Sequence, residues 1–322
     1  MLREQIYAKA IGRIQERRHA ARREQEIRTD QIQREIPEIA ELNRHLQATC
    51  SSILQSLHSE DPAARIKQIE QRSLEADAML RQILTAYGYP ADYLDVHYTC
   101  EICSDSGFTN GRPCVCLEQE IGRIGAEELN AQSRLTLSSF ESFSLHYYND
   151  LPAEQYRAME KILRDCKAYA AEFQPLSSGN LLMIGGTGLG KTHLSLSIAS
   201  VLLEQGFSVI YDSVGNLLHT LEREQFGRGE TSDTLSLLLE CDLLILDDFG
   251  TEFDTSFTRS MIYTLLNSRI NSARPMIVNT NLSHADIQER YGDRILSRLL
   301  FASKILHFYG RDIRMQKFKQ NR

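Results

Sequence analysis

The sequence has no long uninterrupted apolar run, no excess of positive charge, no internal repeat and no low-complexity linker. A membrane-spanning helix requires about 18 consecutive apolar residues, so we expect none here and predict no membrane partner. The 36 Lys and Arg residues are outnumbered by 43 Asp and Glu, which gives a net charge of -7. Any contact with nucleic acid must therefore be local, because the surface is not basic throughout. The N-terminus lacks the apolar core of a secretory signal, which predicts a cytoplasmic protein.

Residues 1–97 predict a helical N-terminal region without a catalytic signature. Up to about residue 36 the chain is dominated by Glu, Arg and Gln, with apolar residues about one turn apart at Leu2, Ile6, Ala10 and Ile14. This spacing predicts a long, mostly solvated helix with a thin apolar stripe. A second helix follows Pro37. A third lies between the signals Asp61-Pro62 and Gly88-Tyr-Pro90, so that the region forms a hairpin or short bundle.

The 322 residues leave room for a second domain, with about 150 residues per domain as a guide. From residue 133 to 322, short apolar runs alternate with helical segments. The runs cover residues 181–184, 208–211, 243–246, 276–278 and 305–308. Such alternation predicts an α/β domain in which helices cover both faces of a parallel sheet.

Four of the seven cysteines fall between residues 98 and 120. The spacing is Cys-x2-Cys, ten residues, then Cys-x-Cys, formed by Cys100, Cys103, Cys114 and Cys116. Two close pairs can place four thiolates around one tetrahedral ion, and Gly107 with Asn110-Gly111 supplies the turns between the pairs. Zn²⁺ is the predicted ion, in a structural knuckle because four cysteines leave no open coordination position; an iron-sulfur cluster is the alternative. The isolated Cys50, Cys166 and Cys241 are interpreted as small core residues.

The pattern Gly-x4-Gly-Lys-Thr follows the first predicted strand and precedes a predicted helix. It consists of Gly185, Gly186, Thr187, Gly188, Leu189, Gly190, Lys191 and Thr192. Glycines at this spacing let main-chain N–H groups close around phosphate oxygens at a helix N-terminus. Lys191 is predicted to reach the β and γ phosphates of ATP, and the Thr192 hydroxyl to bind Mg²⁺. The alternative, an ordinary Gly-rich turn, leaves the flanking strand and helix unexplained.

Polar side chains follow the next buried strands at their predicted carboxyl ends. Asp247 and Asp248 end the run at 243–246, and we assign Asp247 to Mg²⁺ and Asp248 to the attacking water. Asn281 is the predicted γ-phosphate or water contact, with Asn279 as the second choice. Further along, Arg294 and Arg298 lie four residues apart on one helical face, from which an arginine could enter a neighbour's site.

Together these motifs resemble those of AAA+ ATPases of the DnaC/DnaI type, which load the replicative helicase. The resemblance covers about residues 133–322, and the cysteine knuckle looks like that of the DnaI-like branch. It implies that Arg298 is a finger between self-associating subunits and that Arg314 is a second sensor. It also implies the absence of a C-terminal helical lid. Asp248 stands where many AAA+ enzymes carry glutamate, so we expect slow hydrolysis suited to a switch.

The resemblance further implies that the partners are the hexameric replicative helicase, gripped by the N-terminal region, and single-stranded DNA. Candidate DNA contacts in the C-terminal tail are Arg311, Lys317 and Lys319. Three alternatives stay open. The first is an IstB-like transposition ATPase that binds duplex DNA and a transposase, although its usual N-terminal region lacks such a knuckle. The others are a metabolic P-loop kinase, for which no acceptor pocket or basic lid is found, and a binding adaptor with a vestigial ATPase.

Overall fold

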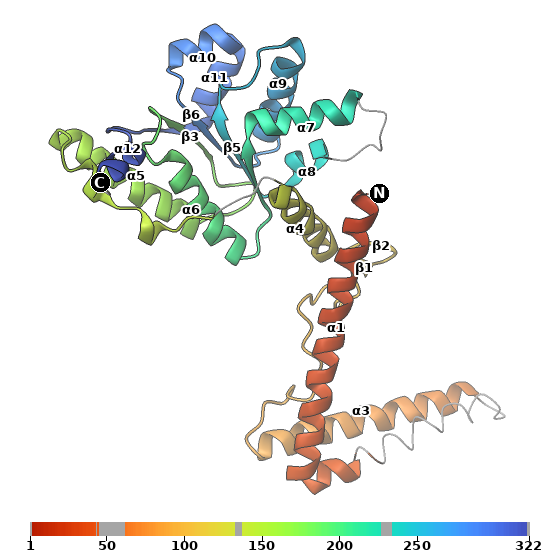
Figure 1. The fold of residues 1–322 in the computed structure, drawn as a ribbon. Coiled ribbons are helices and arrows are strands. Elements are labelled where there is room, and N and C mark those ends of the chain that lie inside the picture. The colour runs from red at the N-terminus through yellow and green to blue at the C-terminus, as the bar shows by residue number, and fades with distance from the viewer. Residues whose placement is uncertain (1, 43, 45–61, 133–136, 227–233, 321–322) are drawn as a thin grey trace. The chain divides into compact units, whose positions relative to one another are not determined.

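A computed structural model describes residues 2–42, 44, 62–132, 137–226 and 234–320 (Figure 1). The chain divides into two compact units, which are considered separately. One unit is Ile11–Cys116, and the other joins Met1–Ala10 to Leu117–Arg322. The domain limits expected from the sequence, 1–97, 98–120 and 133–322, remain a prediction.

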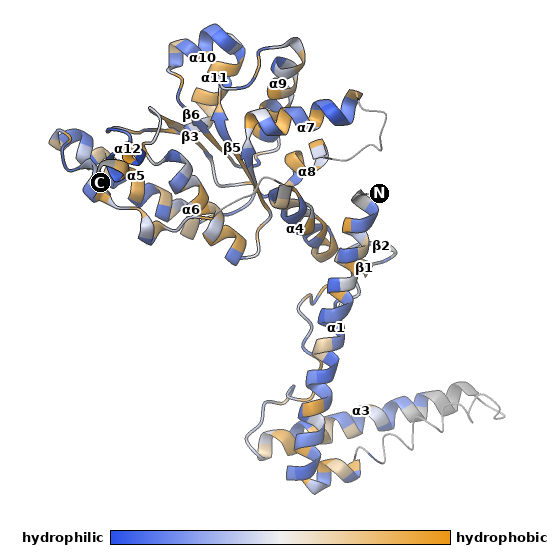
Figure 2. Cartoon of the chain, viewed as in Figure 1, coloured by the Kyte–Doolittle hydropathy of each residue, from blue (hydrophilic) through white to orange (hydrophobic). Residues whose placement is uncertain are grey.

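The unit Ile11–Cys116 is helical apart from its last segment. It contains most of α1 (Leu2–Glu35), helical residues 37–42 and α3 (Pro62–Ala86). Its core joins the end of α1 to α3 through Ile32, Ile36, Ile39, Leu84 and Leu94. The rest of α1 is mostly hydrophilic, as its sequence predicts (Figure 2). The predicted cap Asp61 and the predicted core residue Cys50 lie outside the described residues.

The larger unit is built on a five-stranded parallel sheet with the order β4-β5-β6-β3-β7. The strands are β3 (Asn180–Ile184), β4 (Val209–Ser213), β5 (Leu243–Phe249), β6 (Met276–Thr280) and β7 (Ser303–His307). Each overlaps one of the five apolar runs, so the predicted α/β fold is confirmed. The segments η1 (Phe140–Ser142) and η2 (Leu145–Tyr148) precede the sheet.

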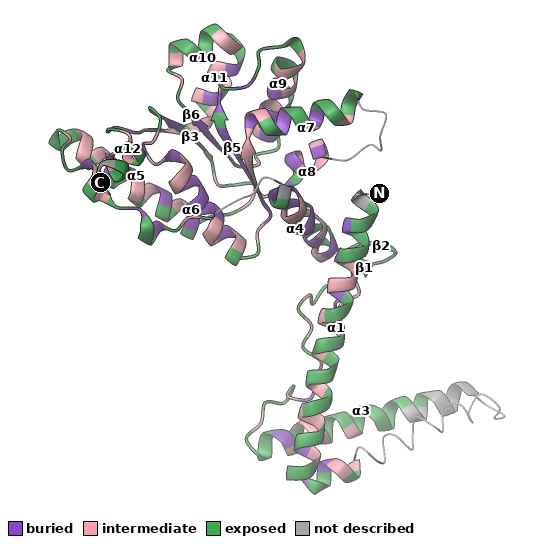
Figure 3. Ribbon diagram, viewed as in Figure 1, coloured by how far each residue is buried: buried purple, intermediate pink, exposed green. Residues whose placement is uncertain are grey.

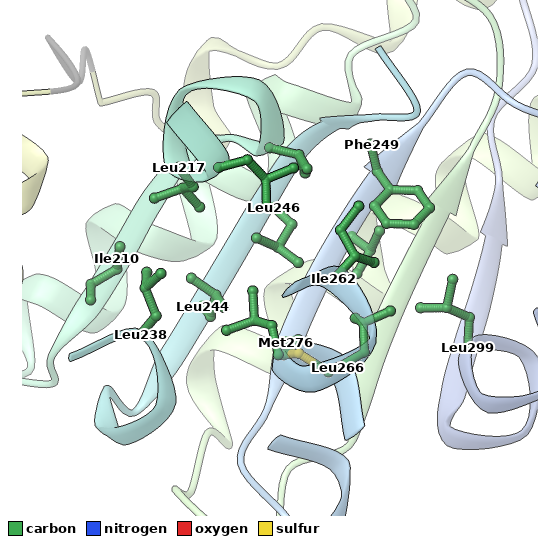
Figure 4. Packing of buried hydrophobic residues seen from close by; sticks show 14 of the residues in the cluster. Ile210, Leu217, Leu238, Leu244, Leu246, Phe249, Ile262, Leu266, Met276 and Leu299 are labelled. Carbon is green, nitrogen blue, oxygen red and sulfur yellow. The ribbon is translucent and has the colours of Figure 1, made fainter. Parts of the chain in front are cut away.

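Helices cover both faces of this sheet because side chains along each strand alternate between them. Leu181, Met183 and Ile245 join a core with α5 (Ala153–Ala171) and α6 (Lys191–Glu204). Neighbouring positions such as Leu244 and Leu246 join the opposite core (Figure 4). That core includes residues of α4 (Val115–Gln132), α7 (Val214–Phe226), α8 (Thr234–Glu240), α9 (Ser256–Asn271), α10 (His284–Tyr291) and α11 (Asp293–Ala302). The inner strands β3, β5 and β6 are accordingly buried on both sides, whereas the edge strands β4 and β7 are only partly buried (Figure 3).

The strand order places the functional edge of the sheet. β3 lies between β6 and β7, yet the chain passes from β3 to the far edge strand β4 before it returns. In parallel sheets a ligand binds at the carboxyl ends of the strands where the order reverses. After β7, the described residues form the short helix α12 (Ile313–Gln320). Within the described part of the chain, no helix has the length and apolarity needed to cross a membrane.

Candidate functional site

The loop between β3 and α6 has the conformation that its glycines were expected to allow. Gly188 and Gly190 both have positive φ, at 73° and 88°, and Gly190 directly precedes α6. A Cβ added to Gly190 would lie 2.8 Å from the Phe143 ring, so this position has no room for a side chain. The loop therefore leads directly into the N-terminus of a 14-residue helix. Free main-chain N–H groups and the helix dipole at such an N-terminus favour an anion.

Lys191 is held inside this loop. Its ammonium donates to the carbonyls of Gly185 and Gly186, at 2.7 and 2.8 Å, and to Asn281 Oδ1 at 2.6 Å. Burial lowers the pKa of Lys191, while Asp247 and Asp248 oppose this shift. The ammonium is thus preorganised between the loop and the end of β6, where a phosphate would exchange with these oxygen acceptors.

Asp247 is a buried carboxylate with several hydrogen-bond donors. The Asp247 residue is only 4% exposed. Thr192 Oγ1 donates to Asp247 Oδ1 at 3.2 Å, and Asn279 Nδ2 donates to the same oxygen at 2.9 Å. Tyr211 OH donates to Asp247 Oδ2 at 2.7 Å. The carboxylate and the Thr192 hydroxyl supply the hard oxygen ligands that suit Mg²⁺, so the residues present fit this ion.

Asp248 faces the opposite way from the core because β5 is irregular there. The pairing of β5 with β6 shifts between Leu246 and Phe249, and Asp248 has a φ of 50°. Such a bulge turns a side chain out of the strand's alternation. Asp248 is exposed and lines the same cavity as Lys191. The cavity walls partly desolvate the Asp248 carboxyl, and this desolvation, followed by the charge of Asp247, raises the pKa of Asp248. The charges of Lys191 and Arg314 oppose the shift.

Asn279 of β6 and Asn281, which directly follows the strand, occupy different places. Asn281, the first choice for the γ-phosphate or water contact, lines the cavity and accepts from Lys191, and its role toward a phosphate stays a prediction. Asn279 is fully buried; its amide donates to Asp247, and its oxygen accepts from Ser195 Oγ at 3.0 Å. Asn279 therefore supports the carboxylate, and Asn281 is the amide that can reach a bound molecule.

These groups surround one cavity of about 510 Å³, a size typical of sites for small molecules. From the expected set, the cavity is lined by Thr187, Gly188, Leu189, Gly190, Lys191, Thr192, Asp247, Asp248, Asn281 and Arg314. Gly185 and Gly186 contribute through their carbonyl contacts with Lys191. The sequence therefore identified residues of one site from three strands and a C-terminal helix.

Helix α12 is attached to the phosphate loop. Its first residue, Ile313, donates its N–H to the carbonyl of Gly188 at 2.9 Å. Arg314 follows and lines the cavity, as does Lys317, whose ammonium lies 5.4 Å from the centre of the Tyr147 ring. Lys317 was expected as a DNA contact, yet here it faces the cavity. Arg311 pairs with Asp150 at 3.3 Å, and the side chain of Lys319 lies outside the described residues.

Arg298 is not brought into this cavity. On α11 its guanidinium donates to Tyr263 OH at 3.2 Å and lies 5.3 Å from the centre of that ring. Arg294, one turn earlier, is exposed. A residue that acts on a neighbouring subunit would be absent from its own cavity, so the role of Arg298 as a finger stays a prediction.

The four clustered cysteines converge in the unit Ile11–Cys116. Their sulfur atoms all lie within 4.8 Å of one another. Cys100 Sγ is 3.8 Å from Cys114 Sγ, and Cys103 Sγ is 3.4 Å from Cys116 Sγ. Tetrahedral zinc with Zn–S bonds of about 2.3 Å separates its sulfurs by about 3.8 Å, so the cluster fits this ion. The pairs are joined by a hairpin of β1 (Phe108–Thr109) and β2 (Arg112–Pro113), which turns at Asn110-Gly111 as expected. The other described cysteines, Cys166 and Cys241, are buried, as predicted.

Sequence reasoning missed several residues of the cavity. Tyr211 ends the predicted run 208–211 and lines the cavity, and a polar hydroxyl at the end of an apolar run was the signal that could have identified it. Phe143, Tyr147 and His193 also line the cavity. His193 Nε2 lies 3.0 Å from the Ser139 carbonyl, which joins α6 to the segment before the sheet. No motif marks that segment.

Comparisons with known proteins agree with this geometry. The model of the family described as IstB-like ATP binding protein matches residues 139–321. The replicative helicase loader DnaC of Buchnera aphidicola subsp. Acyrthosiphon pisum is 23% identical over 223 residues, which cover 66% of this chain and 90% of that protein. An ATP-binding protein of insertion sequence IS21 from Pseudomonas aeruginosa is 28% identical over 214 residues, covering 63% and 76%. A crystal structure of the DnaC helicase loader is 21% identical with a TM-score of 0.47, covering 53% of this chain and 97% of that one.

Proposed function

Because the chain belongs to the family of IstB-like ATP-binding proteins, we propose that it is an ATP-dependent loader of the hexameric replicative DNA helicase. It would place the helicase on single-stranded DNA, with ATP hydrolysis as the switch that ends the interaction. The observation that carries the ATPase part is the single cavity shared by Lys191, the acidic pair Asp247-Asp248 and Asn281. A cation, two carboxylates and an amide around a phosphate loop are the groups that phosphoryl transfer requires.

The predicted site residues have separate parts in this chemistry. Lys191 and the loop N–H groups bind the phosphates, and Thr192 with Asp247 holds the metal. Mg²⁺, when bound, neutralises charge that develops on the phosphate oxygens. Asp248 orients the attacking water and accepts its proton, while Asn281 positions that water against the γ-phosphate. Arg314 adds a second positive charge from α12, and Arg298 supplies the finger to a neighbouring subunit.

The substitution of aspartate for glutamate at position 248 fits a switch better than a motor. An aspartate side chain is shorter than glutamate by one methylene, so its carboxylate lies farther from the attacking water and proton transfer is slower. Slow hydrolysis gives a loader time to complete its task before it leaves. Turnover of many ATP molecules per second by the isolated protein would contradict this part of the proposal.

The cysteine cluster would hold Zn²⁺ as a structural ion. The unit that carries it has a small core, and a closed four-thiolate site contributes folding free energy to such a segment. Asp105 supports the cluster because its buried carboxylate accepts from the N–H groups of Thr99 and Cys100, at 2.8 and 3.1 Å. We propose no catalytic part for this ion.

The helicase partner is supported by the relatives. DnaC proteins named as replicative helicase loaders match about two thirds of this chain and most of their own length. The cysteine cluster, which resembles that of DnaI-like loaders, adds to this support because it precedes the ATPase core. The second candidate is a transposition ATPase, which is favoured by the 28% identity with the IS21 protein. That function would require binding to duplex DNA and to a transposase.

The test is to load the cognate replicative helicase onto circular single-stranded DNA coated with single-strand-binding protein. Unwinding of an annealed oligonucleotide reports loading, and light scattering reports the complex. The proposal expects a defined complex and unwinding that requires this chain and ATP. Lys191→Ala is expected to abolish the ATP dependence. The transposition function would be supported instead if no helicase complex formed in any nucleotide state while duplex DNA was bound tightly.

A further inference from the structure

One edge of the parallel sheet is completed by a side chain instead of a strand. β4 is an edge strand, and residues from α4 lie beside it. The buried Asn130 of α4 donates its amide to the carbonyl of Val209 at 2.6 Å. Its oxygen accepts from the N–H of Tyr211 at 3.0 Å. Asn130 thus pairs with two main-chain groups of β4 as a neighbouring strand would.

Tyr211 extends this contact into the nucleotide cavity. Its main chain is paired with Asn130, its ring lines the cavity, and its hydroxyl donates to Asp247 Oδ2 at 2.7 Å. A tyrosine hydroxyl has one proton to donate and a carboxylate oxygen can only accept, so Tyr211 is the donor in this hydrogen bond.

The two oxygens of Asp247 have different partners. Thr192 and Asn279 donate to Oδ1, so Tyr211 is the donor that the structure records for Oδ2. Groups that orient a metal-binding carboxylate govern metal affinity even though they do not touch the ion. Without the Tyr211 hydroxyl, the Asp247 carboxylate could rotate about its χ2 angle and lose the orientation that faces Thr192.

We propose that Tyr211 is a positioning residue for the metal-binding carboxylate Asp247, and that Asn130 makes this positioning depend on α4. The inference rests on the proposed Mg²⁺-ATP function of the cavity. A displacement of α4 would pull on Val209 and Tyr211 of β4 through the two Asn130 hydrogen bonds and move the Tyr211 hydroxyl relative to Asp247. In return, metal binding at Asp247 would favour one position of α4.

The placement of α4 makes it suited to this part. A Cβ added to its Gly125 would collide with the Leu237 side chain of α8, so the two helices are closely packed at this point. The same helix carries Cys116 of the cysteine cluster in its first turn.

The experiment measures binding of a fluorescent ATP analogue by the full chain, in EDTA and in a titration with Mg²⁺. For Tyr211→Phe we expect the Mg²⁺ concentration at half-saturation to rise about tenfold or more, with affinity in EDTA unchanged within about twofold. Asn130→Ala should shift the Mg²⁺ curve in the same direction. In the double variant the two shifts should be less than multiplicative, because both act through Tyr211 of β4.

Tyr169→Phe is the matched control. This tyrosine also loses one hydroxyl donation, to the Gly179 carbonyl at 3.0 Å, but it lies on α5 and does not line the cavity. Its Mg²⁺ curve should match that of the wild type. Because each variant is compared between EDTA and Mg²⁺, a general loss of folded protein would change both conditions equally.

The outcomes separate the inference from the function on which it rests. If wild-type protein binds the analogue without any influence of Mg²⁺, the proposed function fails and the inference fails with it. If wild-type binding depends on Mg²⁺ but the curve of Tyr211→Phe is unchanged, only the inference is overturned. Shifts of Tyr211→Phe and Asn130→Ala that multiply independently would overturn the connection to α4.

Discussion

Asn281→Ala should separate nucleotide binding from hydrolysis, because Asn281 holds Lys191 before any phosphate arrives. The hydrogen bond from the Lys191 ammonium to Asn281 Oδ1 is 2.6 Å long. A hydrogen bond to a charged group contributes about 1.5–3 kcal/mol, which corresponds to roughly tenfold or more in affinity. ADP has no γ-phosphate for Asn281 to contact, yet its β-phosphate must compete with Asn281 for the Lys191 ammonium. Since water would partly replace the lost amide, we expect ADP to bind about two- to tenfold more tightly.

Hydrolysis should change in the opposite direction. Loss of a group that positions the reacting water in the transition state costs roughly a hundredfold in turnover. The assays are calorimetric titration with Mg²⁺-ADP and a steady-state phosphate-release assay at saturating ATP. Lys191→Ala is the comparison, since it should lose both binding and turnover. The reasoning would be refuted if Asn281→Ala weakened ADP binding by the same factor as it slowed hydrolysis, because Asn281 would then contribute only uniform binding.

Three further changes test other parts of the structure. Desolvation and the charge of Asp247 raise the pKa of Asp248, so its carboxyl group binds a proton more tightly in the folded protein than in the unfolded chain. Above the folded pKa the ionised carboxylate therefore lowers the stability of the fold. Asp248→Asn should therefore raise the melting temperature at pH 7, by an amount that shrinks as the pH falls toward the ordinary aspartate value; an increase that is the same at every pH would contradict this. Cys100→Ser should reduce bound zinc, measured by atomic emission, from one ion per chain toward none, and full retention would rule out the four-thiolate site. Arg269→Met removes a fully buried guanidinium that donates to three main-chain carbonyls. Each unsatisfied carbonyl costs about 1–3 kcal/mol, so the free energy of unfolding measured in urea should fall by roughly 3 kcal/mol or more. A loss below about 1 kcal/mol would show that these carbonyls find other donors.

The strands and the phosphate loop were predictable because their signals are local. A strand buried on both faces must be apolar at nearly every position, which is why residues 181–184 and 243–246 were identified directly. The loop needs glycine where φ is positive, and Gly188 and Gly190 meet that need. The cysteine spacing was informative for a similar reason, since two short pairs restrict the geometry of four sulfurs.

Other features depend on contacts between residues far apart in the chain. The exposure of Asp248 follows from a bulge in the pairing of β5 with β6, and no residue type in β5 predicts that shift in register. Lys317 was one of the candidate DNA contacts in the C-terminal tail, and only the docking of α12 on the Gly188 carbonyl shows that it also lines the cavity. Asn130 resembles any polar residue of a helix until the free edge of β4 is placed beside it.

The sequence by itself determined the fold class, the phosphate loop, the acidic pair and the four-cysteine cluster, because each depends on residue types at short, fixed spacings. Only the tertiary structure decided which strands are neighbours, and therefore which of their terminal side chains share one cavity. It also decided that Tyr211 lies against Asp247 and that Arg298 lies on Tyr263. The physical reason is that side-chain pairing across the chain is set by sheet order and helix packing, which the local pattern of apolar and polar residues does not specify.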